Sequence, residues 1–308
     1  MTSKKIVSSV LKIGLTAVVL YFLYRQVALR WQEIRAYEWQ LHWGWLALSV
    51  VVGIATFFLL ATIWRRIIKG FGHELTHTKA FRIFYLSDLG RYIPGKIWPL
   101  LGILYLAQKE GIPPERAGAS FVLVQLYAIP ASFLVFVAAV LLEPKVLVDQ
   151  VAILGDQSAY IIAAVMLAAA LVIVVRPQWV LAIGNIILRK LKRPPAELAL
   201  DKKVALGILV AYCLAWSCYG LAFWLFVRGV GGNPALHLIA AIGVFNAAYQ
   251  IGYLALFAPG GFGPRELVLG LMLTPFLGPV APAVAIGARL WAVVIESLAA
   301  LLALMVRK

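Results

Sequence analysis

The segment 88-DLGRYIPGKIWP-99 places charged residues and helix breakers together inside an otherwise apolar region. Proline and glycine interrupt helices, and a charge in the middle of a bilayer costs on the order of 2.5–3.5 kcal/mol. An uninterrupted membrane helix would be weakened by both. The segment therefore indicates a broken helix whose charges face protein or a wet cavity.

Composition supports a membrane setting for this segment. The chain has 308 residues, of which 63% are hydrophobic and 13% charged, whereas about a quarter of the residues in a soluble domain are charged. Several apolar runs reach the roughly 20 residues that a spanning helix needs, and none alternates like a barrel strand. We predict an all-α polytopic membrane protein in which residues 1–308 form one membrane domain. Full spans are expected at about 6–24, 43–64, 117–142, 158–175, 204–228 and 280–306.

Two further apolar stretches, 80–107 and 237–276, are interrupted by proline and glycine. Their fragments are too short to cross a bilayer, so we predict two re-entrant or broken helical hairpins. A unit at 43–142 then recurs at 204–306, and the three full spans between the hairpins invert the second unit. Inverted repeats with paired broken helices are typical of transporters, whose sites lie near the membrane midplane.

The basic residues predict the orientation. If each hairpin returns to the side from which it entered, most of the 28 lysines and arginines share one side. The positive-inside rule makes that side cytoplasmic, with both termini there, in the cell (inner) membrane. The net charge of +15 thus needs no nucleic acid as a partner. The basic segment 176–193 is either an amphipathic helix at the cytoplasmic interface or an ordinary positive loop.

Seven ionisable residues remain inside the predicted membrane regions. Asp88 and Arg91 are three residues apart, and Arg289 and Glu296 are seven apart, so each pair is expected to share a helical face and to pair. Basic residues outnumber acidic ones by one, which leaves a cation for an anionic headgroup. The alternative is a charge-paired packing core. The predicted substrate-binding residues are Asp88, Arg91, Lys96, Arg265, Glu266, Arg289 and Glu296.

The second break lies in 257-FAPGGFGPRELVLG-270, where proline suits the first turn of a new helix. A helix N-terminus and an adjacent cation, Arg265 here and Lys96 in the first break, would form an anion site. The residues expected to break the helices are Gly90, Pro94, Gly95, Pro259, Gly261, Gly263 and Pro264. A polar lining of the path is expected from Tyr92, Gln125, Asn246, Tyr249, Gln250 and Tyr253.

A competing motif is 73-HELTH-77, which matches the H-E-x-x-H signature of zinc metallopeptidases. His73 and His77 would bind zinc, and Glu74 would activate water. His42 and His237 are expected near the opposite face, so a third ligand is missing, and we favour a solvated interfacial loop. We predict no metal, no cofactor and no catalytic residue.

The signatures 90-GRYIPGKIW-98 and 259-PGGFGPRE-266 resemble those of the flippase-like membrane domain of the lysylphosphatidylglycerol synthase family, over nearly the whole chain. The resemblance implies a lipid-translocating domain with re-entrant helices. In the full synthases such a domain moves aminoacylated phospholipid between leaflets. Here the chain ends at Lys308 without the aminoacyl-transferase domain, so we do not expect it to make lysyl lipid by itself.

The leading hypothesis is therefore a lipid flippase or transporter and not an enzyme. The headgroup phosphate would lie between the two hairpins, held by Arg91, Lys96 and Arg265. Movement would be passive or ion-driven, because the sequence has no ATP-binding motif. The alternatives are the zinc metallopeptidase and a non-catalytic partner of a lipid-modifying enzyme. A homo-oligomer is compatible with any of these.

Overall fold

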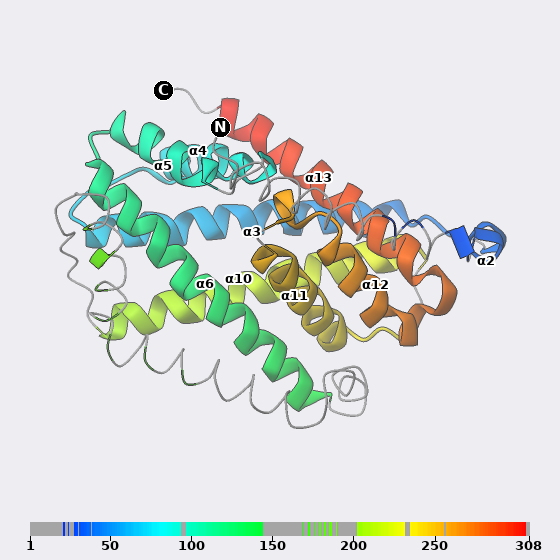
Figure 1. Cartoon of the computed structure of the whole chain (residues 1–308). Coiled ribbons are helices and arrows are strands. Elements are labelled where there is room, and N and C mark those ends of the chain that lie inside the picture. The colour runs from blue at the N-terminus through cyan, green and yellow to red at the C-terminus, as the bar shows by residue number, and fades with distance from the viewer. Residues whose placement is uncertain are drawn as a thin grey trace, which may run out of the picture.

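The structure is a computed structural model, and its regular elements, where the chain is described, are all helices. It describes residues 31–37, 39–93, 97–143, 202–231, 235–255 and 257–305, with isolated positions between 21 and 29 and between 168 and 189. The predicted spans 6–24 and 158–175 and the basic segment 176–193 lie wholly or mostly outside the described residues. The helices run as α2 (Trp31–Ala36), α3 (Trp43–Gly70), α4 (His77–Asp88), η1 (Leu89–Tyr92), α5 (Trp98–Gln108), α6 (Pro114–Leu142), α10 (Lys202–Gly229), α11 (Leu238–Leu254), η3 (Pro259–Gly261), α12 (Pro264–Leu277), η4 (Gly278–Val280) and α13 (Ala281–Met305) (Figure 1).

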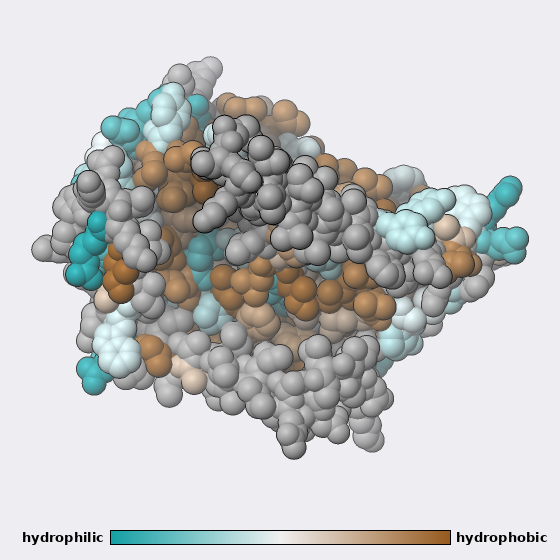
Figure 2. Space-filling view, in the orientation of Figure 1, coloured by the Kyte–Doolittle hydropathy of each residue, from teal (hydrophilic) through white to brown (hydrophobic). Residues whose placement is uncertain are grey.

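Four helical stretches in the described part of the chain are long and apolar enough to cross a membrane. They are α3, α6, α10 and the stretch Pro264–Met305, which η4 divides into α12 and α13. These helices coincide with four of the predicted spans, at 43–64, 117–142, 204–228 and 280–306. Figure 2 shows hydrophobic residues over most of the described surface in view, with hydrophilic residues gathered mainly at the two ends. A long apolar body with polar ends fits a protein that crosses a bilayer.

Both interrupted stretches are pairs of short helices separated by irregular backbone. In the first, α4 has 12 residues and α5 has 11, and the chain between them leaves helical geometry at Ile93. In the second, α11 has 17 residues, α12 has 14, and η3 lies between them. A helix of 12 residues is about 18 Å long, well short of the roughly 30 Å of hydrocarbon. The two members of each pair pack against each other.

The two series α3–α6 and α10–α13 show the same packing order. In each series every helix packs on the next one, and across the series α6 lies on α10 and α11 as α13 lies on α3 and α4. The backbone N–H of His42, before α3, donates to the carbonyl of Gly229 at the end of α10, at 2.8 Å. Therefore α3 and α10 run in opposite directions, and α6 and α13 do so as well (Figure 1).

Glycines and buried polar contacts join these helices closely. A Cβ on Gly220 of α10 would lie 2.8 Å from the Cα of Ile242 on α11. The indole of Trp64 on α3 donates to the hydroxyl of Ser120 on α6 at 3.0 Å. Such contacts fix the relative positions of helices whose apolar surfaces alone would pack in many ways.

We predict that Gly220→Ala lowers the melting temperature of the purified protein by several degrees, because the added methyl must displace the backbone of α11. The matched control is Gly207→Ala in the same helix, where no atom lies within 4 Å of the added Cβ. Alanine there should leave the melting temperature unchanged or raise it, since alanine favours helix. Equal melting temperatures for the two variants would contradict the close packing of α10 on α11.

Candidate functional site

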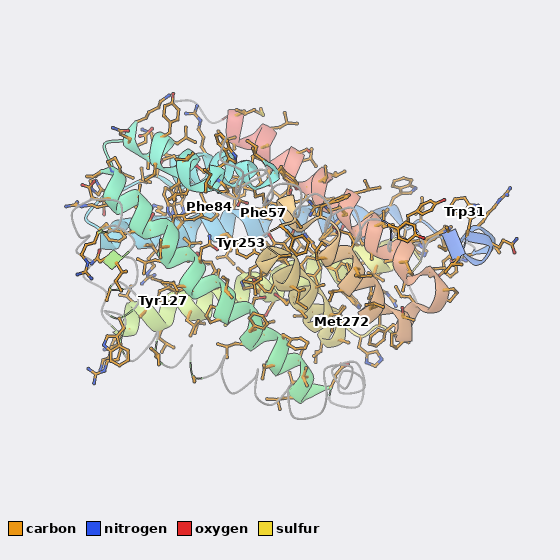
Figure 3. All side chains as sticks on the ribbon, viewed as in Figure 1. Trp31, Phe57, Phe84, Tyr127, Tyr253 and Met272 are labelled. Carbon is orange, nitrogen blue, oxygen red and sulfur yellow. The ribbon has the colours of Figure 1, made fainter. Side chains whose placement is uncertain are left out.

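A cavity of about 140 Å³ lies where the two helix breaks meet. Its walls come from both series of helices, and Phe57 of α3, Phe84 of α4 and Tyr253 of α11 lie together there, in the middle of the molecule (Figure 3). Predicted site residues on its walls are Asp88, Arg91, Tyr92, Gln125, Tyr249, Gln250, Tyr253, Gly261, Arg265, Arg289 and Glu296. Pro94, Gly95 and Lys96 lie outside the described residues. The structure thus brings residues from both breaks to one cavity.

The guanidinium of Arg91 pairs with two carboxylates. Its Nη2 lies 2.9 Å from Asp88 Oδ2 and 3.1 Å from Glu296 Oε1, and its Nη1 donates to the hydroxyl of Tyr249 at 3.0 Å. The hydroxyl of Tyr92 also donates to Glu296. We call Asp88, Arg91 and Glu296 the Arg91 cluster. It confirms the expected Asp88–Arg91 pair and, with two carboxylates on one cation, has a formal charge of −1.

The expected pairing of Arg289 with Glu296 is wrong. Arg289 Nε lies 3.7 Å from Glu266 Oε1, and its Nη1 donates to the carbonyl of Gly260 at 3.2 Å. Glu296 turns instead to Arg91 on the other break. Residues seven apart share a face of one helix, but several other helices pack against that face. Glu266 and Glu296 therefore each pair with an arginine from a different element.

Among the described charged residues of the cavity, Arg265 is the one without a counter-ion. Its residue is 5% exposed, and no carboxylate of the described chain lies within ion-pair distance. Its guanidinium lies over two rings, 4.6 Å from the centroid of Tyr249 and 5.1 Å from that of Phe245. Its Nη2 is buried and has no hydrogen-bond partner in the described structure. A buried cation that, among the described residues, lies over two rings and pairs with no carboxylate has the chemistry to bind an anion at the cavity.

The N-terminus of α12 is less open than the sequence suggests. Pro264 begins the helix as predicted, but Glu266 Oε2 accepts a hydrogen bond from the backbone N–H of Gly263 at 2.6 Å. The helix therefore caps itself with its own carboxylate, which uses part of the N-terminal positive potential. In the first break, α5 begins at Trp98, two residues after Lys96. An anion in the cavity would therefore bind the side chain of Arg265 and not a free helix N-terminus.

Glycine allows the second break to fold tightly beneath Arg265. Gly261 has φ +71°, and a Cβ on it would lie 2.7 Å from the carbonyl oxygen of Gly252. A Cβ on Gly252 would lie 2.6 Å from the Cβ of Arg265. Side chains at either position would push the break away from α11. These glycines therefore set the position of Arg265.

The predicted polar lining is only partly right. The hydroxyl of Tyr253 donates to Gln125 Oε1 at 2.7 Å, so this pair joins α11 to α6 on the cavity wall. Asn246 is fully buried and does not line the cavity. Its side chain accepts from Ser132 and donates to the carbonyl of Ile242, so it links helices instead.

One wall of the cavity was missed by the sequence analysis. Tyr212, Trp216 and Tyr219 of α10 line it, and the hydroxyls of both tyrosines have no hydrogen-bond partner in the described structure. Gln250 Oε1 is also without one. Spacings of four and three residues place the three aromatic residues on one helical face, which is the signal that would have indicated this wall.

The zinc motif has no support in the described structure. Residues 73–76 are not helical, and α4 begins only at His77, so the two histidines are not one helical turn apart. Arg116 Nη1 donates to His73 Nε2 at 2.8 Å, and Lys69 lies 2.7 Å from Glu74, which lowers the pKa of this carboxyl below its usual range. No group of three metal-binding side chains occurs among the described residues.

Comparison with protein families gives one result that covers almost the entire chain. The family model described as the lysylphosphatidylglycerol synthase TM region matches residues 9–304. No curated protein matches the chain. The match includes both helix breaks and every charged residue of the cavity.

We predict that Arg91→Gln lowers the melting temperature far more than Arg265→Gln. Removing Arg91 leaves the buried Glu296 without its cation, which costs about 3–5 kcal/mol, whereas removing Arg265 leaves no carboxylate unpaired. Arg265→Gln should therefore lower the melting temperature only slightly, because it removes no direct ion-pair partner of a carboxylate. If both variants lose the same stability, Arg265 has a carboxylate partner.

Purified protein is predicted to contain no stoichiometric zinc, because His73 already accepts a hydrogen bond from Arg116 and lies outside the helix. Elemental analysis after mild chelation measures this, and His77→Ala serves as the matched variant. One zinc per chain in the wild-type protein, lost in His77→Ala, would restore the metallopeptidase interpretation.

Proposed function

The chain belongs to the lysylphosphatidylglycerol synthase transmembrane family, and on that premise we propose that it is a flippase or transporter that moves an anionic or phosphate-bearing lipid between leaflets. Phospholipids and polyprenyl-linked phosphates are the candidate substrates. The observation that carries the proposal is Arg265, a buried cation on the cavity wall that pairs with no carboxylate of the described residues. Burying such a cation is costly unless an anion joins it during the working cycle.

The walls of the cavity suit a lipid headgroup. One part of the lining is charged or hydroxylated, with Arg265, Tyr249 and Tyr219 close to one another. Another part is apolar and includes Phe84, Phe121 and Ile129, against which the first carbons of a lipid chain could lie. The hydroxyls of Tyr212 and Tyr219, which have no hydrogen-bond partner among the described residues, offer hydrogen bonds to phosphate oxygens in the cavity. A volume of about 140 Å³ suffices for a headgroup but not for a whole lipid, so the chains would remain outside.

We further propose that the helix pairs α4–α5 and α11–α12 are re-entrant hairpins of an inverted repeat. Their short helices, the matching packing order of the two series and the opposite directions of α3 and α10 support this arrangement. The charged residues of both breaks would then lie near the membrane midplane. An anion at Arg265 would be within reach of either leaflet after a small rearrangement of the hairpins.

The distribution of basic residues supports an orientation in the cell membrane. Arg65, Arg66 and Lys69 at the end of α3 lie at the same end of the molecule as the starts of α6 and α10 (Figure 1). By the positive-inside rule this end would face the cytoplasm. Both chain termini would then be cytoplasmic.

The protein would act as a transporter without catalysing a reaction. No observation on the described residues favours the metallopeptidase. A role as a partner of a lipid-modifying enzyme is compatible with transport and would be carried by the same site.

The proposal predicts that protein in liposomes accelerates the crossing of fluorescent phosphatidylglycerol or of a labelled polyprenyl phosphate, and that Arg265→Gln reduces the rate at least tenfold. The reason is that Arg265 is the one cavity cation among the described residues that is not paired with a carboxylate, and the variant removes it from the headgroup. Dithionite quenching of the fluorescent lipid gives the rate, and Arg265→Lys should retain part of it.

A matched control is Arg228→Gln, which also removes an arginine that lies over an aromatic ring, 5.6 Å from the centroid of Trp224, but outside the cavity. Liposomes with this variant should show lipid crossing at the wild-type rate. The proposal fails if neither labelled anion crosses faster with wild-type protein than with Arg265→Gln.

A further inference from the structure

The charges around the cavity balance only when the cavity is empty of anions. Three carboxylates, Asp88, Glu266 and Glu296, face three guanidiniums, Arg91, Arg265 and Arg289, and the six described charges sum to zero. The charges are nevertheless distributed unevenly among three groups. The Arg289–Glu266 pair is neutral, the Arg91 cluster has a charge of −1, and Arg265 has +1.

Tyr249 connects the two unbalanced groups. Its hydroxyl accepts a hydrogen bond from Arg91, and its ring lies beneath the guanidinium of Arg265. In the empty cavity, the surplus negative charge of the Arg91 cluster is thus offset by Arg265 across a single side chain. An anion on Arg265 removes this compensation and leaves the cluster with an uncompensated charge in a poorly solvated site.

We propose that binding of an anion at Arg265 is coupled to the uptake of one proton by the two carboxylates of the Arg91 cluster, so that each anionic lipid crosses together with a proton. The inference rests on the proposed function, since it needs an anion at Arg265. The proton comes from water and goes to the Asp88–Glu296 pair, which then has a charge of −1 against the +1 of Arg91. The occupied cavity is again neutral, and proton movement down its gradient drives lipid movement.

The surroundings of the cluster suit this role. The side chain of Glu296 is 4% exposed, so it is strongly affected by an uncompensated charge, whereas that of Asp88 is 36% exposed and is the more accessible of the two carboxylates. The other titratable or charged side chains on the walls around the cluster are Tyr85, Tyr92, Tyr212, Tyr219, Tyr249, Tyr253, Arg265 and Arg289, with Glu266 behind Arg289. Tyrosines are neutral below about pH 10, and both arginines keep their charge, so the carboxylates are the groups that can take the proton.

Calorimetry tests the coupling directly. Short-chain phosphatidylglycerol, whose phosphodiester keeps one negative charge between about pH 5 and 8, is titrated into wild-type protein in two buffers of different ionisation enthalpy. The difference between the two heats gives the number of protons exchanged. We expect close to one proton taken up at the pH where coupling is complete, and an affinity that falls about tenfold per pH unit across that same pH range.

The informative variant is Glu296→Gln, which holds a permanent neutral side chain in place of the protonated acid. It should take up no proton and should bind the lipid about tenfold more tightly than wild type at pH 8, whereas simple damage to the site would weaken binding at every pH. Asp88→Asn, at a more exposed position, tests the same pair if Glu296→Gln does not fold.

The outcomes separate the two proposals. Absence of binding of both short-chain phosphatidylglycerol and a short-chain polyprenyl phosphate to wild-type protein overturns the proposed function. Binding without proton uptake overturns only the coupling. This result is expected if Lys96, outside the described residues, supplies the positive charge that balances the Arg91 cluster when an anion is bound. Proton uptake that persists unchanged in both variants overturns it as well, because the proton then goes elsewhere.

Discussion

A buried guanidinium without a carboxylate is the feature on which the site depends. The rings of Tyr249 and Phe245 stabilise Arg265 by about 2 kcal/mol, which is less than the several kcal/mol that desolvating a charge costs. The remaining compensation comes from the negative Arg91 cluster on the far side of Tyr249. Such an arrangement is stable enough to fold but favours any anion that can reach Arg265.

The cavity exists because the two breaks meet, and neither break would form it alone. The first contributes Asp88, Arg91 and Tyr92, the second contributes Arg265 and the tight turn beneath it, and α13 adds Glu296. Tyr92 packs so closely against Gly260 that a Cβ there would lie 3.2 Å from its ring, and Arg289 covers the same glycine from α13. Helix breaks, small residues and buried charges therefore belong to one design, in which irregular backbone is tolerated because it lines a cavity.

Much of this arrangement follows from the sequence, because apolar length, proline and charge are local signals. The four described long helices, both breaks and the Asp88–Arg91 pair were predicted in this way. The partner of Glu296 was not, because spacing along one helix says nothing of a guanidinium delivered by another element. Asn246 and the tyrosines of α10 were assigned wrongly or missed for the same reason: helical periodicity gives the face of a helix but not the neighbour of that face.

The central claim is that an anionic headgroup binds at Arg265, and an electron cryomicroscopy structure in nanodiscs of anionic lipid tests it most directly. The account predicts headgroup density in the cavity, with a phosphate within hydrogen-bond distance of the Arg265 guanidinium and Arg91 still paired with its carboxylates. The contradicting result is a cavity without headgroup density in which the Arg265 guanidinium pairs with Asp88, Glu266 or Glu296. The charges would then form a closed packing core.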